Sequence, residues 1–215
     1  MARRSSILLN VLDSQVRIEL DTAERFFRLS ELRFQHERDK LERQCKKHPK
    51  SYWNKYMGHG VTLGDLLDDE FVEVREMQRL NRYFGVILVY STFERILQRI
   101  YKEAKRLGDI KNKRASARPY LDFKGYVKVF KKDLGIDLTA RSAEYAALNK
   151  LRVIRNVIAH DAGWTRENLK QYGFEKHQQI ELNEKYFFEV MELARTEGAF
   201  IIDSYRNFLL GTESS

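Results

Sequence analysis

The chain of 215 residues has a single cysteine, two prolines and no long apolar run. Cys45 alone excludes an intrachain disulfide and a zinc site built from cysteines, and so little cysteine fits a reducing cytosol. The longest apolar run covers residues 84–90, which is far too short to span a bilayer. We therefore expect a cytoplasmic protein without a membrane partner.

Strand signals are also nearly absent, and both prolines fall in polar stretches that predict loops. Hydrophobic residues make up 43% of the chain and aromatic residues 12%, enough to form a buried core. The apolar periodicity predicts an all-α fold, a bundle of about five helices with a long N-terminal helix. The expected helices cover residues 14–47, 65–107, 123–133, 141–160 and 183–210.

Several helix ends are predicted as well. A helix as long as 65–107 is expected to kink or break, with Gly85 as the candidate position, and to end at Gly108. Asn183 is expected to cap the last helix, and either Thr139 or Ser142 the helix over 141–160.

Two parts of the chain are expected to differ in role. Residues 1–62 are predicted to form an N-terminal helical extension packed on the same domain, and residues 63–211 are predicted to form the main helical domain. The seven-residue spacing of apolar positions from Leu20 to Leu41 leaves two alternatives open for the first helix, a coiled-coil arm and a dimer contact.

The positive charge is concentrated in one segment. The whole chain carries a formal net charge of +8, and residues 102–141 hold twelve Lys and Arg against five acidic residues. Such a segment favours a polyanionic partner, most simply nucleic acid, over a basic surface kept for solubility or an acidic partner. The residues expected to bind RNA are Lys111, Lys113, Arg114 and Arg118.

Residues 151–160, which read LRVIRNVIAH, are the most informative stretch. Wound as a helix at about 100° per residue, they separate into one apolar and one polar arc. Arg152, Asn156 and His160 form an i, i+4, i+8 row on the polar arc, with the small Ala159 beside it. A second surface can approach closely there, so this arc suits a phosphate-handling cleft. A helix whose Arg and His are merely solvated gives the same spacing, and both readings stay open.

The run Arg155-Asn156-x-x-x-His160 on an apolar helix resembles the signature of the HEPN superfamily, in which an Arg precedes a His by four to six residues. Other segments are also similar to parts of HEPN domains. They are residues 89–97, which contain Ser-x-Phe-Glu, residues 134–138, and residues 180–183 before the last helix. The resemblance covers residues 65–210.

The resemblance implies a metal-independent endoribonuclease without a cofactor, built as a homodimer whose motif helices face each other. RNA supplies its own nucleophile, the 2′-OH, so the site needs a base, an acid and cations for the phosphate. Histidine serves either proton role near neutral pH, and two protomers provide one His160 each. The implied catalytic residues are Arg155, Asn156 and His160, supported by Arg152 and Glu94. For Glu94 the alternative is a local partnership with Gln98 on its own helix.

The same resemblance implies a toxin or an abortive-infection, antiphage effector that cuts RNA, with tRNA as one candidate, and a cognate antitoxin or defence-system partner. One subgroup of HEPN toxins carries a Tyr two residues after the His, where adenylyl groups are attached. Ala162 stands there in this chain, which argues against silencing by that chemistry. The competing hypothesis is a non-catalytic HEPN-like module that binds RNA or protein.

Other chemistries find little support. No metal-ligand spacing surrounds the remaining histidines, and the chain has no glycine-rich phosphate loop. We expect neither a metal nor a cofactor.

Overall fold

The computed structural model describes residues 2–111 and 117–211, with side chains from residue 7 onward. Within these residues the chain is all-α, as predicted, and forms no strands beyond three isolated bridges between loop residues. The helices are α1 (Ala2–Lys47), α2 (Lys50–Trp53), α3 (Leu63–Leu107), α5 (Phe123–Asp133), α6 (Ser142–Asp161) and α7 (Glu184–Gly211), with the 3-10 turns η1 (Leu138–Ala140) and η2 (Lys170–Tyr172).

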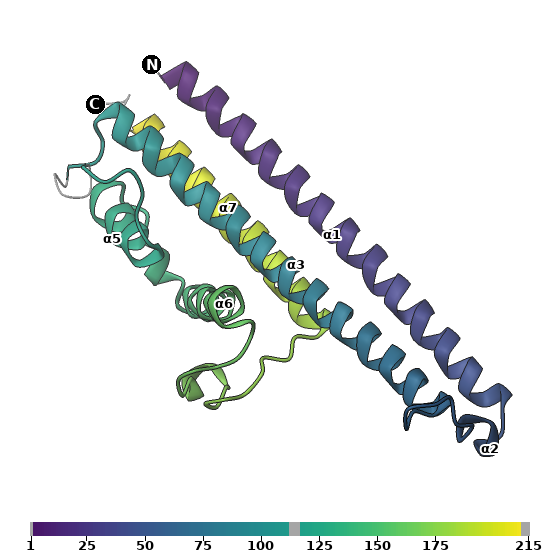
Figure 1. Ribbon diagram of the computed structural model, residues 1–215. Coiled ribbons are helices and arrows are strands. Elements are labelled where there is room, and N and C mark those ends of the chain that lie inside the picture. Colours follow the sequence, from purple (N-terminus) through teal and green to yellow (C-terminus); the bar gives the residue numbers. More distant parts are fainter. Residues whose placement is uncertain (1, 112–116, 212–215) are drawn as a thin grey trace.

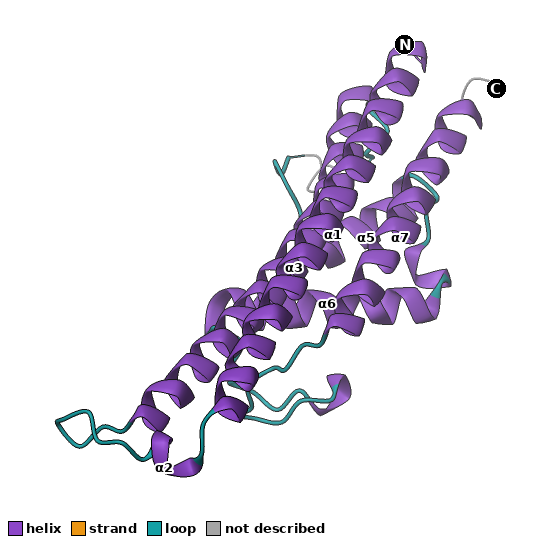
Figure 2. Cartoon of the chain, turned by 90° about the vertical axis from the view of Figure 1, so that its right-hand side faces the viewer, coloured by secondary structure: helices purple, strands orange, loops and turns teal. Residues whose placement is uncertain are grey.

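Three long helices form the body of the molecule. α1 and α3 run side by side as a hairpin closed by α2, and α7 packs along both of them over part of their length (Figure 1). The hairpin continues past the start of α7, and we call that part, residues 32–47 and 63–81, the arm (Figure 2). At its base Glu31 of α1 pairs with Arg82 of α3 at 2.8 Å, and Arg82 also donates to the carbonyl of Leu182.

α1 starts twelve residues earlier than the predicted residue 14. Leu9 and Leu12 are buried and continue the apolar stripe of the helix, so burial extends it past Asn10 and Asp13. The predicted division between residues 62 and 63 stays a prediction, while α1 packs on α3 and α7 of the same bundle.

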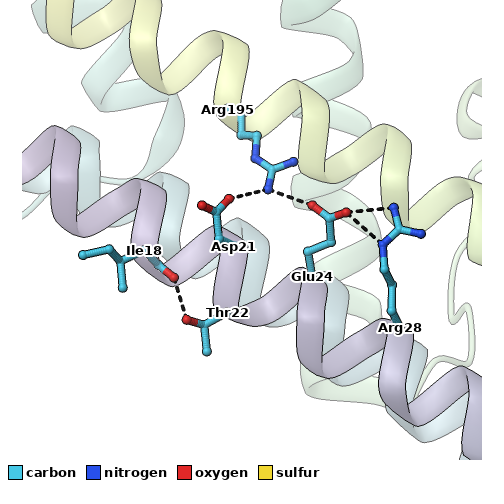
Figure 3. Close-up of polar contacts among 6 residues, drawn as sticks. All are labelled: Ile18, Asp21, Thr22, Glu24, Arg28 and Arg195. Atoms are coloured by element: carbon cyan, nitrogen blue, oxygen red, sulfur yellow. Dashed lines mark hydrogen bonds and ion pairs between the residues drawn. The ribbon is translucent and has the colours of Figure 1, made fainter.

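Polar contacts also join α1 to α7 on the rim of the bundle. Arg195 of α7 lies between Asp21 and Glu24 of α1, at 2.7 and 2.8 Å, and Arg28 binds the same Glu24 (Figure 3). The two arginines lower the pKa of Glu24. This contact joins Asp21 and Arg195, which are 174 positions apart in the chain.

The predicted break at Gly85 is wrong, because α3 continues through it as one helix of 45 residues. Gly85 instead allows α7 to approach closely. A Cβ atom at this position would lie 2.7 Å from Cε2 of Phe187, whose ring stacks on Phe27 at 3.6 Å between centroids. Gly108 ends α3 in the left-handed conformation, as predicted.

α5 and α6 pack on the bundle through the flank of α3, and α6 lies across the middle of that helix (Figures 1 and 2). Neither predicted cap of α6 is correct, because Arg141 precedes its first turn and makes no side-chain cap. The hydroxyl and the amide of Thr139 both donate to Asp137 instead, which caps η1.

The last helix begins as predicted. The side-chain oxygen of Asn183 accepts a hydrogen bond from the amide of Tyr186 at 2.8 Å, which caps the first turn of α7. Across residues 2–111 and 117–211, none of the helices carries an apolar stretch long enough to cross a membrane.

Candidate functional site

α6 buries the apolar arc of the sequence motif against the body of the molecule. Leu151, Ile154, Val157 and Ile158 are buried in the core, whereas Val153, predicted on the same arc, is only partly buried. The polar arc divides along its length, because Arg152, Arg155 and Asn156 are partly buried, whereas Ala159 and His160 are exposed. The helix ends at Asp161, where Ala162 takes the left-handed conformation and Gly163 follows with a φ of +86°.

Arg155 is directed toward α3. Its Nη2 atom lies 3.9 Å from Oε2 of Glu94, and its Cζ atom lies 5.7 Å from the ring centroid of Tyr90. Its Nη1 atom donates to Oδ1 of Asn156 at 3.1 Å. Its Nε atom is buried and has no hydrogen-bond partner among the described residues. The guanidinium therefore ties the motif helix to the middle of α3.

Glu94 lies in a half-buried position on α3. Burial raises the pKa of its carboxyl group, and the charge of Arg155 and the nearby Tyr90 hydroxyl oppose that rise only in part. Burial also raises the pKa of Tyr90, so its hydroxyl stays protonated. That hydroxyl is near the carboxylate but does not meet it in normal hydrogen-bond geometry. Glu94 faces Arg155 at 3.9 Å, and its supporting role at the site stays a prediction.

A shallow hollow of about 250 Å³ opens beside the C-terminal end of α6. Asn156 and His160 line it from the helix, and Arg166 and Glu167 line it from the loop that follows. Arg166 forms an ion pair with Asp161, which fixes the loop against the last turn of α6. Amide, imidazole and guanidinium groups thus border one solvent-open space.

The loop that carries Arg166 is held by backbone and side-chain bonds. The buried Thr165 hydroxyl donates to the carbonyls of Glu175 and Gln178 and accepts from the amide of Gln178. Isolated bridges join Trp164 to Gln179 and Leu169 to Phe174. These bonds therefore hold in place the loop that forms one wall of the hollow.

The structure brings only part of the predicted site together. Asn156 contacts Arg155 on one side and the hollow on the other, and His160 shares the hollow. Arg155 does not line the hollow. Arg152 does not line it either and donates to Asn149, which in turn donates to the hydroxyl of Tyr172.

Two residues at the site were not singled out from the sequence. Arg166 follows His160 by six positions, but nothing in the helical periodicity indicates that the loop folds back. Tyr90 stands four residues before Glu94, and that i, i+4 spacing in the segment 89–97 is a signal that both side chains lie on one face of α3.

The basic segment runs up to the start of α6, but Lys111 and Arg118 lie apart from the motif residues of that helix. Lys111 and Arg118 are exposed, and the carbonyl of Arg118 accepts from Tyr101 and Lys105 in the last turns of α3. Lys113 and Arg114 lie outside the described residues. The motif helix contacts the middle of α3, at Tyr90 and Glu94.

Within the described part of the chain, no three His, Cys, Asp or Glu side chains cluster as metal ligands do. Comparison of the chain with protein-family models, with curated proteins and with solved structures gives no match. The HEPN resemblance therefore rests on the pattern of residues quoted above.

Proposed function

We propose that the protein is a metal-independent endoribonuclease of HEPN type, a cytoplasmic toxin or antiphage effector that cuts RNA, tRNA being one candidate substrate. The observation that carries the proposal is the hollow at the end of α6, which His160 and Asn156 line together with Arg166, Asp161 and Glu167. An exposed imidazole beside a guanidinium supplies a proton-transfer group and a cation for one phosphate.

The reaction follows from the chemistry of RNA. A base removes the proton of the 2′-OH, the 2′-oxygen attacks the neighbouring phosphorus, and the bond from phosphorus to the 5′-oxygen breaks. An acid returns a proton to that leaving oxygen. The products are a 2′,3′-cyclic phosphate and a free 5′-OH, and no oxidant or further reactant is needed.

Two protomers fit this reaction better than one. A single His160 serves one of the two proton transfers in a turnover, and a second copy supplies the other. Ala159 is exposed next to His160 and carries no side chain beyond Cβ, so a symmetric neighbour approaches α6 closely there. Arg155 then acts as a positioning residue that orients Asn156 through their hydrogen bond.

A second candidate function has its own observation. Arg155 is engaged with Glu94 and Asn156 and does not line the hollow, which favours a role in holding α6 to α3. Under this reading the chain is a non-catalytic HEPN-like module. The hollow and the basic segment then bind RNA or a partner protein, such as a cognate antitoxin or defence component, without cutting RNA.

Cleavage by the purified chain separates the two functions. Wild type and His160→Ala are incubated with total RNA and with tRNA in EDTA, and the new ends are tested for 2′,3′-cyclic phosphate. The enzyme predicts that His160→Ala lowers the rate by at least about 100-fold. His160 is exposed, so the variant should keep the helical content and melting temperature of wild type.

Growth of cells that express each protein adds an independent readout. Wild type should arrest growth and His160→Ala should not. If neither the RNA products nor the growth curves distinguish the two proteins, the enzyme proposal is wrong. RNA binding by both proteins would then favour the non-catalytic module.

A further inference from the structure

A groove of about 640 Å³ runs along the arm between α1 and α3. Phe34 and Leu41 of α1 and Val74 of α3 line it. The groove and α6 lie on opposite sides of α3, because Met77 in the groove and Tyr90 beside Arg155 are thirteen positions apart, about 220° around the helix. This surface is therefore separate from the candidate active site.

Large apolar side chains are exposed around the groove. Phe26 of α1 and Phe84 of α3 form an edge-to-face pair at its upper end, with centroids 6.5 Å apart, and each is 54% exposed. Met77, which lines the groove from α3, is also exposed. Exposed apolar side chains on adjoining helices are typical of a contact surface.

The two edges of the groove differ in charge, because Arg33, Lys40 and Glu37 line it from α1 and only acidic residues among the charged ones line it from α3. Glu37 pairs with Lys40 at 3.6 Å, and the acidic residues of α3 are Glu70 and Glu73. Among the described residues no ion pair crosses the groove from one edge to the other. The acidic edge thus offers two carboxylates without a cation from this chain.

Lys40 on α1 and Glu70 on α3 lie at the same position along the length of the arm. α1 and α3 run antiparallel, and the Phe26–Phe84 pair sets their register. Lys40 lies fourteen residues after Phe26, and Glu70 lies fourteen residues before Phe84. Lys40 and Glu70 are therefore at the same height on opposite edges.

We propose that the arm groove is a contact between two copies of this chain, paired about a two-fold axis that runs along the groove. In this arrangement α1 of each copy faces α3 of the other, so Lys40 of one protomer meets Glu70 of its partner at both edges. The exposed phenylalanines of both copies meet at one level, and the arms form a four-helix bundle. An antiparallel pairing sets α1 against α1 and α3 against α3, which brings like charges together.

This contact does not depend on RNA cleavage and leaves α6 uncovered. The α6 surface of each copy therefore stays accessible. The arm contact and a contact through Ala159 can form at the same time, which would give an assembly larger than a dimer.

Sedimentation of the full chain over a range of concentrations tests the apolar part of the contact. Phe26→Glu should weaken self-association by at least about 100-fold, since each dimer contains the buried charge twice at the level where the phenylalanines of both copies meet. Val72→Glu is the matched control, because Val72 is 51% exposed on the same arm but on the other side of α3. Circular dichroism checks that both variants keep the helical content of wild type.

A charge exchange tests the arrangement itself. Lys40→Glu and Glu70→Lys should each weaken self-association by about tenfold or more, because each places like charges at both edges. Mixed together, the two variants should form a heterodimer with the affinity of wild type, since both edges of the mixed pair are again opposite in charge. Contacts within one chain cannot produce this recovery on mixing.

The proposal is overturned by any of three results. The first is a wild type that stays monomeric at about 100 µM, where even a contact with Kd near 10 µM is populated. The second is a Phe26→Glu protein that associates like wild type. The third is a pair of charge variants that remain weak when mixed.

Discussion

Arg155 of α6 and Glu94 of α3 face each other at 3.9 Å, each with 28% of its side chain exposed. The pair links the motif helix to a helix sixty residues away in the chain. Burial raises the pKa of Glu94, and the charge of Arg155 opposes that rise, so the pairing favours the charged form of the carboxylate.

Removal of Arg155 should destabilise the protein in a pH-dependent way. Arg155→Ala leaves Glu94 half-buried without its cation, so we expect a loss of about 1–3 kcal/mol at pH 7. The folded state then binds a proton on Glu94 more tightly than the unfolded state, so the penalty should shrink as the pH falls through the folded pKa. Thermal unfolding between pH 4 and pH 8 measures it. Arg155→Ala combined with Glu94→Gln should recover much of the loss, and a double variant no better than the single one would contradict the pairing.

A bulky residue at Ala159 should disrupt the composite site. Ala159→Trp is expected to abolish RNA cleavage and to leave the protein folded, because the position is exposed. Ala146→Trp, at an exposed position on another face of α6, is the control and should cut RNA like wild type. Cleavage assays and sedimentation of the two variants provide the measurement. A fully active Ala159→Trp protein would show that no second copy approaches there.

The basic segment should contribute to RNA affinity through phosphates. Changing Lys111 and Arg118 to Gln removes two exposed cations, so log Kd should depend less steeply on log salt, by at most about two units of slope. Filter binding at several salt concentrations tests this, and the cleavage position should not change. An unaltered slope would mean that these two cations do not contact RNA.

Two helical glycines should respond differently to alanine. A Cβ at Gly85 meets the ring of Phe187 at 2.7 Å, and a stacked ring cannot move without disturbing the core. Overpacking should cost about 1–3 kcal/mol of stability, which exceeds the roughly 1 kcal/mol gained from the higher helix propensity of alanine. Gly85→Ala should therefore destabilise the protein. At Gly198 the Cβ meets only the end of the flexible Ile96 side chain, so Gly198→Ala should be neutral or stabilising. Denaturant unfolding compares them, and equal effects would argue against the close approach.

Asp137 should stabilise the turn η1 that precedes α6, except at strongly acidic pH. Lys131, at 2.7 Å, and Thr139 lower the pKa of its carboxyl group to about 2. A lowered folded pKa means that the stabilisation is present above the ordinary pKa of 3.8 and is lost as the pH falls through about 2. Asp137→Asn should therefore lower the melting temperature at pH 6 and converge with wild type near pH 2. A constant difference at all pH values would rule out this linkage.

Helical periodicity located most of the fold because each long helix buries one continuous stripe. It failed where a local signal competed with packing. The predicted start of α1 at residue 14 came too late, because Leu9 and Leu12 are buried in the core. Gly85 suggested a break in α3, yet the close approach of Phe187 accounts for it.

The candidate site was predictable in its helix faces but not in its side-chain directions. The two arcs of α6 follow from spacing alone, and all of the apolar arc but Val153 is buried as expected. The direction of Arg155 depends on Glu94 and Tyr90, which a distant helix supplies. Arg166 reaches the hollow because the loop folds back, and the loop bonds of Thr165 that fix it have no periodic signature.

The contact of α7 with α1 also has a consequence for folding during synthesis. Arg195 and Phe187 complete a surface that α1 and α3 began to form more than eighty residues earlier. Until the ribosome has made α7, Phe27 and the face of α3 around Gly85 have no cover, and the nascent chain exposes them to water and to other chains. The hairpin of α1 and α3, complete at residue 107, therefore stays open on this side while residues 108–183 are made, and its core closes only once α7 is available.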